Sequence, residues 1–268
     1  MILRRNKIKR ALAEGKVVCG CVVSSRSPII IEMLGYTGFE WLFIDTEHVP
    51  IESGLELEHL IRAAEASDIC PIVRVKENAE HYIRNALEAG AQGVVIPHVA
   101  TKEDAEKAVR NARFPTIGVR GADPTVRSAR YKCGDFNWGE FIRESNEEAM
   151  VIALLEDKEF LGNLDDIVSV AGIDAVCFGP TDYALSLGLN LMYDFSHPKI
   201  KAAFEAVVAC AKKHGKPVLS AVNPCTVEQS KMLADMGVKM QHFSSDLNII
   251  GGAFKTLMDN VVSKVKQS

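Results

Sequence analysis

The chain has 268 residues, of which 47% are hydrophobic and 25% are charged, as is ordinary for a soluble globular protein. Its 31 basic and 35 acidic residues leave a formal net charge of −4, which gives no electrostatic basis for binding nucleic acid or an anionic membrane. No apolar stretch is long enough to span a bilayer, so we expect small-molecule partners, no nucleic acid and no membrane.

The seven cysteines are odd in number, widely scattered and without a Cys-x-x-Cys pair, which argues against a disulfide framework and a zinc site. We therefore expect the protein in the reducing cytoplasm. The basic residues 1–16 lack the apolar core of a secretory signal, and we expect them to form a first helix.

Eight short runs of β-branched and apolar residues alternate with segments of helical periodicity. They predict strands at residues 17–23, 41–45, 71–75, 93–99, 150–156, 175–179, 217–222 and 239–244. This alternation predicts an α/β protein, a (β/α)8 TIM barrel forming a single domain over residues 1–268. A doubly wound open sheet is the alternative, disfavoured because no Gly-x-Gly-x-x-Gly follows the first run.

The second and third predicted strands end in polar residues. FIDTEHVP places Asp45, Glu47 and His48 at the barrel rim, where a histidine flanked by acids can act as a general base. PIVRVKEN brings Arg74 to the same rim, where its planar guanidinium suits a carboxylate or enolate. The alternatives are a helix-capping cluster for the acids and His48, and a salt bridge to Asp45 or Glu47 for Arg74. Lys76 lies in a polar stretch, which favours a solvated lysine over a Schiff-base lysine.

The fourth predicted strand ends at His98, a position from which the residue can line the pocket, although an isolated histidine is weak evidence for a site. A long connection at residues 114–148 then leads to the fifth strand with only weak helical character. Connections of this length in a compact domain are usually functional or disordered. Because it carries Arg120, Arg127 and Trp138, we expect this connection to cover the active site.

Two carboxylates close the fifth and sixth predicted strands: Glu156 ends AMVIALLE, and Asp182 follows IDAVCFGPT. The carboxyl ends of neighbouring barrel strands share one face, so the two acids repel each other unless a cation lies between them. A hard divalent ion with oxygen ligands meets that need, while two solvated loop acids are the alternative.

Together these residues form a rational site for enolate chemistry. A divalent metal would chelate a 2-oxo acid through its keto oxygen and one carboxylate oxygen and would stabilise the enolate as a Lewis acid. Arg74 would add positive charge at the developing oxyanion.

At these residues the sequence resembles the HpcH/HpaI aldolases, which are metal-dependent, pyruvate-forming class II aldolases on a phosphoenolpyruvate-binding barrel. The similar segments are FIDTEHVP, PIVRVKEN, LEAGAQGVVIPHV, GVRG and DAVCFGPTD, in order through nearly the whole chain. The resemblance implies reversible, divalent-metal-dependent cleavage of a 4-hydroxy-2-oxo acid to pyruvate and an aldehyde.

The resemblance also implies roles for individual residues. Glu156 and Asp182 would bind Mg²⁺, Mn²⁺ or Co²⁺, and the turn Pro180–Asp182 would hold the pyruvate carboxylate through the backbone amides around Thr181. Arg74 would contact the pyruvyl oxygen, and His48 would be the acid/base of aldol cleavage. Arg120, Arg127 and Trp138 of the long connection would contribute to the aldehyde pocket. A homo-oligomer is implied, usually a hexamer that exchanges a C-terminal helix, here within residues 246–265.

Two positions depart from the family pattern. Leu154 stands where many members carry a glutamine two residues before the metal-binding glutamate, which removes a polar group near the metal. Glu88 stands where members often have an aspartate paired with the catalytic histidine. These departures leave open a catalytically weakened metal- or keto-acid-binding barrel, beside a related enolate-type carbon–carbon lyase or an oxaloacetate decarboxylase.

Overall fold

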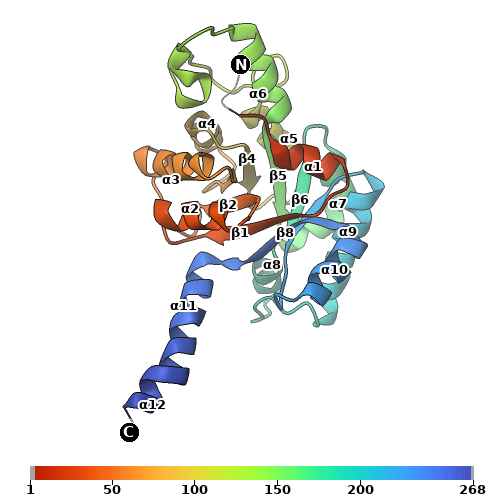
Figure 1. The fold of residues 1–268 in the computed structure, drawn as a ribbon. Helices are drawn as coiled ribbons and strands as arrows, with labels where there is room; N and C mark the ends of the chain where they lie inside the picture. Colours follow the sequence, from red (N-terminus) through yellow and green to blue (C-terminus); the bar gives the residue numbers. More distant parts are fainter. Residues whose placement is uncertain (1–3, 267–268) are drawn as a thin grey trace.

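A closed barrel of eight parallel strands forms the centre of the computed structural model, which describes residues 4–266 (Figure 1). The strands pair in chain order, and β1 pairs with β8 to close the ring, so the (β/α)8 prediction is confirmed and the open sheet is ruled out. The strands are β1 (Val18–Val23), β2 (Trp41–Asp45), β3 (Cys70–Arg74), β4 (Gly93–Ile96), β5 (Met150–Leu155), β6 (Ala175–Phe178), β7 (Val218–Ala221) and β8 (Val238–Ser245). Each predicted strand is present, with bounds that differ by no more than three residues.

The described residues form α-helices before, between and after the strands, and most of these helices form the outer layer of the barrel. They are α1 (Lys7–Ala13), α2 (Pro28–Tyr36), α3 (Leu55–Ala66), α4 (Glu80–Ala89), α5 (Lys102–Ala112), α6 (Trp138–Glu148), α7 (Leu164–Ser169), α8 (Pro180–Ser186), α9 (Pro198–Lys213), α10 (Val227–Met236), α11 (Asp246–Leu257) and α12 (Ser263–Val265). Short 3-10 turns lie at Arg127–Lys132 and Lys158–Asn163, and a π turn at Met258–Val262. Local chemistry fixes several ends: Thr101 and Asp104 form a capping box at α5, and α4 ends at Gly90 with a φ of 110°.

Two apolar cores hold the barrel together. One fills the barrel interior with side chains such as Trp41, Phe43 and Ile152, and Ile8 of α1 joins it from the amino-terminal end. The other lies between the strands and the surrounding helices and contains most of the buried aliphatic residues. The barrel is therefore a packed core, and only its ends offer space for a site.

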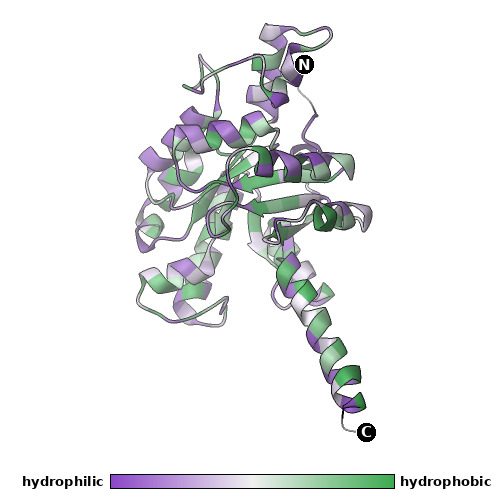
Figure 2. Ribbon diagram, turned by 90° about the vertical axis from the view of Figure 1, so that its left-hand side faces the viewer, coloured by the Kyte–Doolittle hydropathy of each residue, from purple (hydrophilic) through white to green (hydrophobic). Residues whose placement is uncertain are grey.

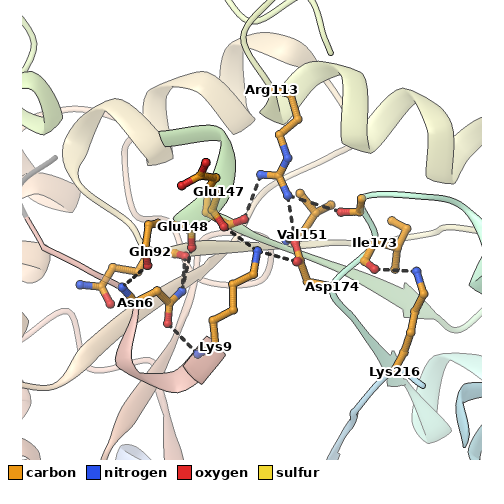
Figure 3. A network of polar contacts seen from close by, with 12 residues as sticks. Asn6, Lys9, Gln92, Arg113, Glu147, Glu148, Val151, Ile173, Asp174 and Lys216 are labelled. Atoms are coloured by element: carbon orange, nitrogen blue, oxygen red, sulfur yellow. Dashed lines mark hydrogen bonds and ion pairs between the residues drawn. The ribbon is translucent and has the colours of Figure 1, made fainter. Parts of the chain in front are cut away.

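A polar network closes the amino-terminal end of the barrel (Figure 3). Asn6 donates hydrogen bonds through Nδ2 to the carbonyl oxygens of Gln92 at 2.8 Å and Glu148 at 3.2 Å. Lys9 of α1 places Nζ 2.7 Å from the carboxylate of Asp174, which also accepts from Arg113 at 3.0 Å. Because α1 is tied down across this end, the carboxyl-terminal end is left as the open face.

The C-terminal helix α11 leaves the barrel after β8 and projects away from it (Figure 1). Figure 2 shows apolar and polar residues mixed along this projecting helix. Large apolar side chains exposed on it are Leu247, Ile249, Phe254 and Leu257. Among the described helices, none is both long and apolar enough to cross a membrane.

The long connection at residues 114–148 is more ordered than its sequence suggests and lies elsewhere than expected. It contains the 11-residue helix α6, begun by Asn137, whose side chain accepts a hydrogen bond from the Glu140 amide. Phe114 and Phe141 pack together with ring centroids 5.7 Å apart. Because this connection follows a helix, it starts at the amino-terminal end of the barrel, and in its own subunit it does not cover the carboxyl-terminal face.

Candidate active site

A cavity of about 110 Å³ opens at the carboxyl-terminal ends of the strands. Six residues that the sequence analysis singled out line this cavity: Arg74, Leu154, Glu156, Pro180, Thr181 and Asp182. They come from β3, from β5 and its end, and from the start of α8, so the structure brings these strand ends together as the sequence predicts.

Arg74 is held in the cavity by two acids from the end of β2. Its Nε and Nη2 donate to the two carboxylate oxygens of Asp45 at 3.0 and 2.8 Å, and Nη1 lies 3.0 Å from Glu47. Burial alone would lower the pKa of Arg74, but the hydrogen bonds and charge of Asp45 outweigh it and raise that pKa. The salt bridges considered as an alternative therefore exist, and they orient a permanently charged guanidinium toward the cavity.

Glu156 is almost completely buried, with only 2% of its surface exposed. Gly179 permits this position, because a Cβ there would lie 2.8 Å from Oε2 of Glu156. Burial raises the pKa of Glu156 to about 7, and the negative charges of Glu47 and Asp182 act in the same direction. A cation bound beside Glu156 would relieve this repulsion and favour the charged form of its carboxylate.

His98 lies beside Glu156, a contact that its isolated position in the sequence did not indicate. Its backbone N–H donates to Oε1 of Glu156 at 3.0 Å, and its ring nitrogens lie 3.5 Å from Glu47 and 3.1 Å from Asp157. Burial alone would lower the pKa of His98, but the charges of Glu156, Asp157 and Glu47 outweigh it and raise that pKa. A φ of 54° at His98 turns the chain so that the residue reaches these acids.

The acids and His98 fit a divalent cation. Ligand atoms of Glu47, His98 and Glu156 all lie within 4.8 Å of one another, and Asp182 lines the same cavity. Carboxylate oxygens suit Mg²⁺ or Mn²⁺, and an additional imidazole nitrogen suits a transition-metal ion such as Mn²⁺ or Co²⁺. Glu47 Oε2 is buried and has no hydrogen-bond partner among the described residues, although it lies near Arg74, so this oxygen retains capacity for a ligand.

The remaining candidates at this face occupy its rim and wall. His48 is exposed just outside the cavity, and its backbone N–H lies 3.4 Å from the Asp45 carboxylate. Lys76 places Nζ 6.0 Å from the ring centre of Tyr82 and does not line the cavity. Leu154 contributes an apolar wall directly below Glu156.

Glu88 and the expected aldehyde residues lie apart from this cavity in the same subunit. Glu88 is in the last turn of α4, near the amino-terminal end, 3.6 Å from Arg84, and no contact with His48 is present among the described residues. Burial raises its pKa, opposed by the charges of Arg120 and Arg84.

Each of the three expected aldehyde residues has partners near the amino-terminal end. Arg120 is buried 4.3 Å over the ring of Phe114, and Arg127 pairs with Glu65 and donates to the Ala89 carbonyl at 2.8 Å. Trp138 packs in the aromatic cluster of α6. None of the three lines the cavity that holds Glu156.

Comparisons with known proteins agree with this geometry. The family model of HpcH/HpaI aldolase/citrate lyase matches residues 19–250. The 5-keto-4-deoxy-D-glucarate aldolases of Klebsiella pneumoniae and Escherichia coli O6:H1 are 31% and 32% identical over 254 residues, covering 95% of this chain and 96% of each relative.

Solved structures give the same result. An HpcH/HpaI aldolase/citrate lyase family protein from Burkholderia cenocepacia J2315 superposes with a TM-score of 0.87 at 28% identity, covering 96% of this chain and 99% of that one. Citrate synthase SbnG gives a TM-score of 0.85 at 30% identity over 96% and 98% of the two chains. Macrophomate synthase gives 0.85 at 27% identity over 97% and 89%. The chain belongs to the HpcH/HpaI aldolase/citrate lyase family and is an aldolase-type carbon–carbon lyase.

Proposed function

We propose that this enzyme reversibly cleaves a 4-hydroxy-2-oxo acid to pyruvate and an aldehyde, and that it depends on a divalent metal ion. The observation that carries the proposal is the meeting of buried Glu156, Asp182 and the ion-paired Arg74 around one cavity. The two acids can hold the metal that chelates a 2-oxo acid, and the fixed guanidinium of Arg74 can meet the oxyanion that develops at the keto oxygen.

Glu156 and Asp182 are the proposed protein ligands of Mg²⁺, Mn²⁺ or Co²⁺, with Glu47 and His98 close enough to orient the metal's water ligands. When bound, such an ion supplies Lewis-acid stabilisation of the enolate. Leu154 contributes no polar atom on this side of the site, so Glu47 and His98 would supply the polar contacts beside a bound metal.

Arg74 is proposed to contact the pyruvyl oxygen, and Asp45 to hold Arg74 in place for that contact. The turn Pro180–Asp182 is proposed to bind the pyruvate carboxylate. Thr181 supports this role, because its Oγ1 is buried and lacks a hydrogen-bond partner among the described residues. The first N–H groups of α8 lack intrahelical acceptors as well.

His48 is proposed as the acid/base that moves the proton of the C4 hydroxyl. Its exposed position at the rim leaves it free to meet the aldehyde side of the substrate. Glu88 is too far along α4 to orient His48 in the same subunit, so the proposed pairing requires Glu88 of a neighbouring subunit. The same condition applies to Arg120, Arg127 and Trp138 as parts of an aldehyde pocket.

A homo-oligomer, expected to be a hexamer, is proposed to form through α11. The support is the projection of this helix with Phe254 and Leu257 exposed, since isolated apolar helices are normally buried against a partner. A cytoplasmic location is proposed from the free cysteines, Cys70 and Cys177 among them, which are buried in the strands.

The test is exchange of the pyruvate methyl protons in D2O, followed by NMR. Exchange that needs Mg²⁺, Mn²⁺ or Co²⁺ and stops on chelation supports the proposal, and exchange must be accompanied by carbon–carbon bond formation when aldehydes are added. A protein that binds pyruvate without exchanging its methyl protons is the binding barrel instead. Release of CO2 from oxaloacetate without any aldol addition indicates a decarboxylase.

A further inference from the structure

A second cavity, of about 350 Å³, lies beside the candidate pyruvate cavity. Four residues line both: Val22 of β1, Tyr193 of the loop before α9, Ala221 of β7 and His242 of β8. Because the same four residues line both spaces, the two cavities adjoin each other. A substrate held in the first cavity can extend into the second.

The lining of the second cavity mixes apolar and neutral polar side chains and carries no formal charge. Among the described residues that line it, Asn223, Ser244, Ser245 and Asn248 supply amide and hydroxyl groups, and none is Asp, Glu, Lys or Arg. Arg74 lines the first cavity and not the second, and its guanidinium is engaged by Asp45 and Glu47. Arg120 and Arg127, the cations proposed for the aldehyde pocket from a neighbouring subunit, are themselves buried, and Arg127 is paired with Glu65. A carboxylate entering the second cavity therefore finds no free cationic partner.

His242 is the polar group best placed to meet a substrate across the boundary. Its Nδ1 is buried and has no hydrogen-bond partner within residues 4–266. Burial lowers the pKa of His242 to about 4, and the charge of Arg74 acts in the same direction. The ring is therefore neutral near pH 7. The ring also has a backbone hydrogen bond with Ser244, so one ring position, Nδ1, is left to meet a substrate hydroxyl group.

Tyr193 supplies a second neutral group at the same boundary. Its φ of 51° is unusual for a tyrosine and turns the loop so that the residue lines both cavities. Burial raises the pKa of Tyr193, and the nearby groups that also act on it include Cys177 and Arg74. The phenol therefore stays protonated and able to donate a hydrogen bond.

We propose that the second cavity receives the uncharged, hydroxylated remainder of the substrate, with His242 as its specificity-determining residue. The aldehyde partner is then a neutral hydroxyaldehyde and not an aldehyde that carries a carboxylate. This inference rests on the proposed function. With the pyruvyl carboxylate at α8 and its keto oxygen at Arg74, the carbon that forms the new bond faces β1, β7 and β8. A preference for a neutral aldehyde would separate this enzyme from its relatives named for 5-keto-4-deoxy-D-glucarate, a dicarboxylate.

The reaction used in the test is aldol addition. A C3–H bond of pyruvate breaks, a bond forms between C3 and the aldehyde carbon, and the aldehyde oxygen takes up a proton to become the C4 hydroxyl. No oxidant or reductant is required.

Three matched aldehydes of three carbons test the proposal with the intact Mn²⁺-loaded enzyme. Glyceraldehyde ends in CH2OH, lactaldehyde in CH3 and tartronate semialdehyde in a carboxylate, and the three are otherwise alike. We expect kcat/KM for addition of pyruvate to be highest for glyceraldehyde and at least about tenfold lower for tartronate semialdehyde. Equal values, or a preference for tartronate semialdehyde, overturn the proposal.

Two variants connect this preference to the cavity. His242→Phe keeps an aromatic ring without hydrogen-bonding atoms and should lower kcat/KM for glyceraldehyde by about tenfold, so that its ratio to lactaldehyde falls toward one. Asn248→Arg places a cation at the cavity and should raise kcat/KM for tartronate semialdehyde. His59→Phe, the same change on the exposed face of α3, is the control and should alter none of the three rates. An unchanged glyceraldehyde-to-lactaldehyde ratio in His242→Phe removes His242 from the site.

Methyl proton exchange of pyruvate distinguishes an error in the proposed function from an error in the assignment of the second cavity. Absence of exchange with the wild-type enzyme contradicts the proposed function itself. Normal exchange with the wrong aldehyde preference contradicts only the assignment of the second cavity.

Discussion

Both carboxylate oxygens of Asp45 accept hydrogen bonds from Arg74, at 3.0 and 2.8 Å, in a two-point contact between the ends of β2 and β3. Such bidentate pairs fix the plane of the guanidinium as well as its position. The direction in which Arg74 presents its remaining donors is therefore set by a neighbour that need not touch the substrate.

Asp45→Asn should lower the rate of pyruvate methyl exchange by at least about tenfold, because one oxygen and the negative charge that hold Arg74 are lost. Arg74→Lys should be at least as severe, since a point charge cannot replace the planar fork. Mn²⁺ binding, measured by electron paramagnetic resonance, should persist in both. Arg62→Lys on α3, where Arg62 pairs with Glu58 near the surface, is the control. Exchange at the normal rate in Arg74→Lys would remove the guanidinium from the reaction.

Removal of the metal should abolish both proton exchange and aldol cleavage, and Mn²⁺, Mg²⁺ or Co²⁺ should restore them. Glu156→Gln should weaken metal binding strongly, because it removes a buried anionic ligand, whereas Asp157→Asn, a neighbouring partly exposed acid, serves as the comparison. Treatment with borohydride in the presence of pyruvate should leave the enzyme active, since Lys76 lies outside the cavity. Activity that survives chelation and is lost to borohydride contradicts the metal assignment.

His48→Ala should cost about 100-fold or more in aldol cleavage, the scale of a positioned acid/base. Glu88→Gln should lower the rate and shift the acidic limb of the pH profile downward, because loss of a nearby negative charge lowers the pKa of an imidazolium. If Glu88 acts on His48 of a neighbouring subunit, mixed oligomers of His48→Ala and Glu88→Gln subunits should be more active than either variant alone. Absence of complementation together with an unchanged pH profile rules out the pairing.

His242 should make the metal-free protein less stable in acid. Its folded-state pKa of about 4 lies below the ordinary value near 6.5, so the folded protein binds fewer protons than the unfolded chain. The contribution of His242 to the free energy of unfolding therefore keeps its full value above pH 6.5 and decreases as pH falls toward 4, because protons bind the unfolded chain more readily than the buried His242 ring. Urea unfolding in chelator at pH 7.5 and 4.5 should show wild type losing up to about 3 kcal/mol more than His242→Phe. Equal losses in the two proteins would show that His242 is not buried in its neutral form.

Charges placed on α11 should dissociate the oligomer. Phe254→Asp combined with Leu257→Asp puts two carboxylates on a helix that is exposed and partly apolar in the single subunit. Light scattering coupled to gel filtration should show a shift from a hexamer to smaller species, with little change in helix content. Thr256→Asp, on the same helix, is the matched control for charge alone. A monomeric wild-type protein would refute the role of α11.

Much of the fold is readable from the sequence because β-branched runs and helical periodicity alternate strictly. The convergence of Arg74, Glu156 and Asp182 is also readable, since parallel strand ends in a barrel must share one face. The strand-end position of His98 was readable, but its contact with Glu156 was not, because that contact depends on a local left-handed backbone conformation.

The composition of residues 114–148 led to a wrong prediction of where this connection lies. Arg120 and Arg127 suggested a binding loop, yet each is buried in contacts at the other end of the barrel. A signal was available: a segment that follows a helix begins at the amino-terminal end of the strands. The second cavity around His242 could not be inferred, because it results from small side chains on β1 and β7 that are close only in the closed barrel.

The pairing of β1 with β8, in which Gly20 lies opposite His242, has a consequence for synthesis on the ribosome. The first strand to emerge keeps an open hydrogen-bonding edge until the last strand has been translated. Nascent chains therefore spend most of translation as incomplete sheets, for which β-strand pairing with other chains competes with closure. We expect this protein to depend on chaperones that shield the edge of β1, and stalled chains that end before β8 to be found in aggregates.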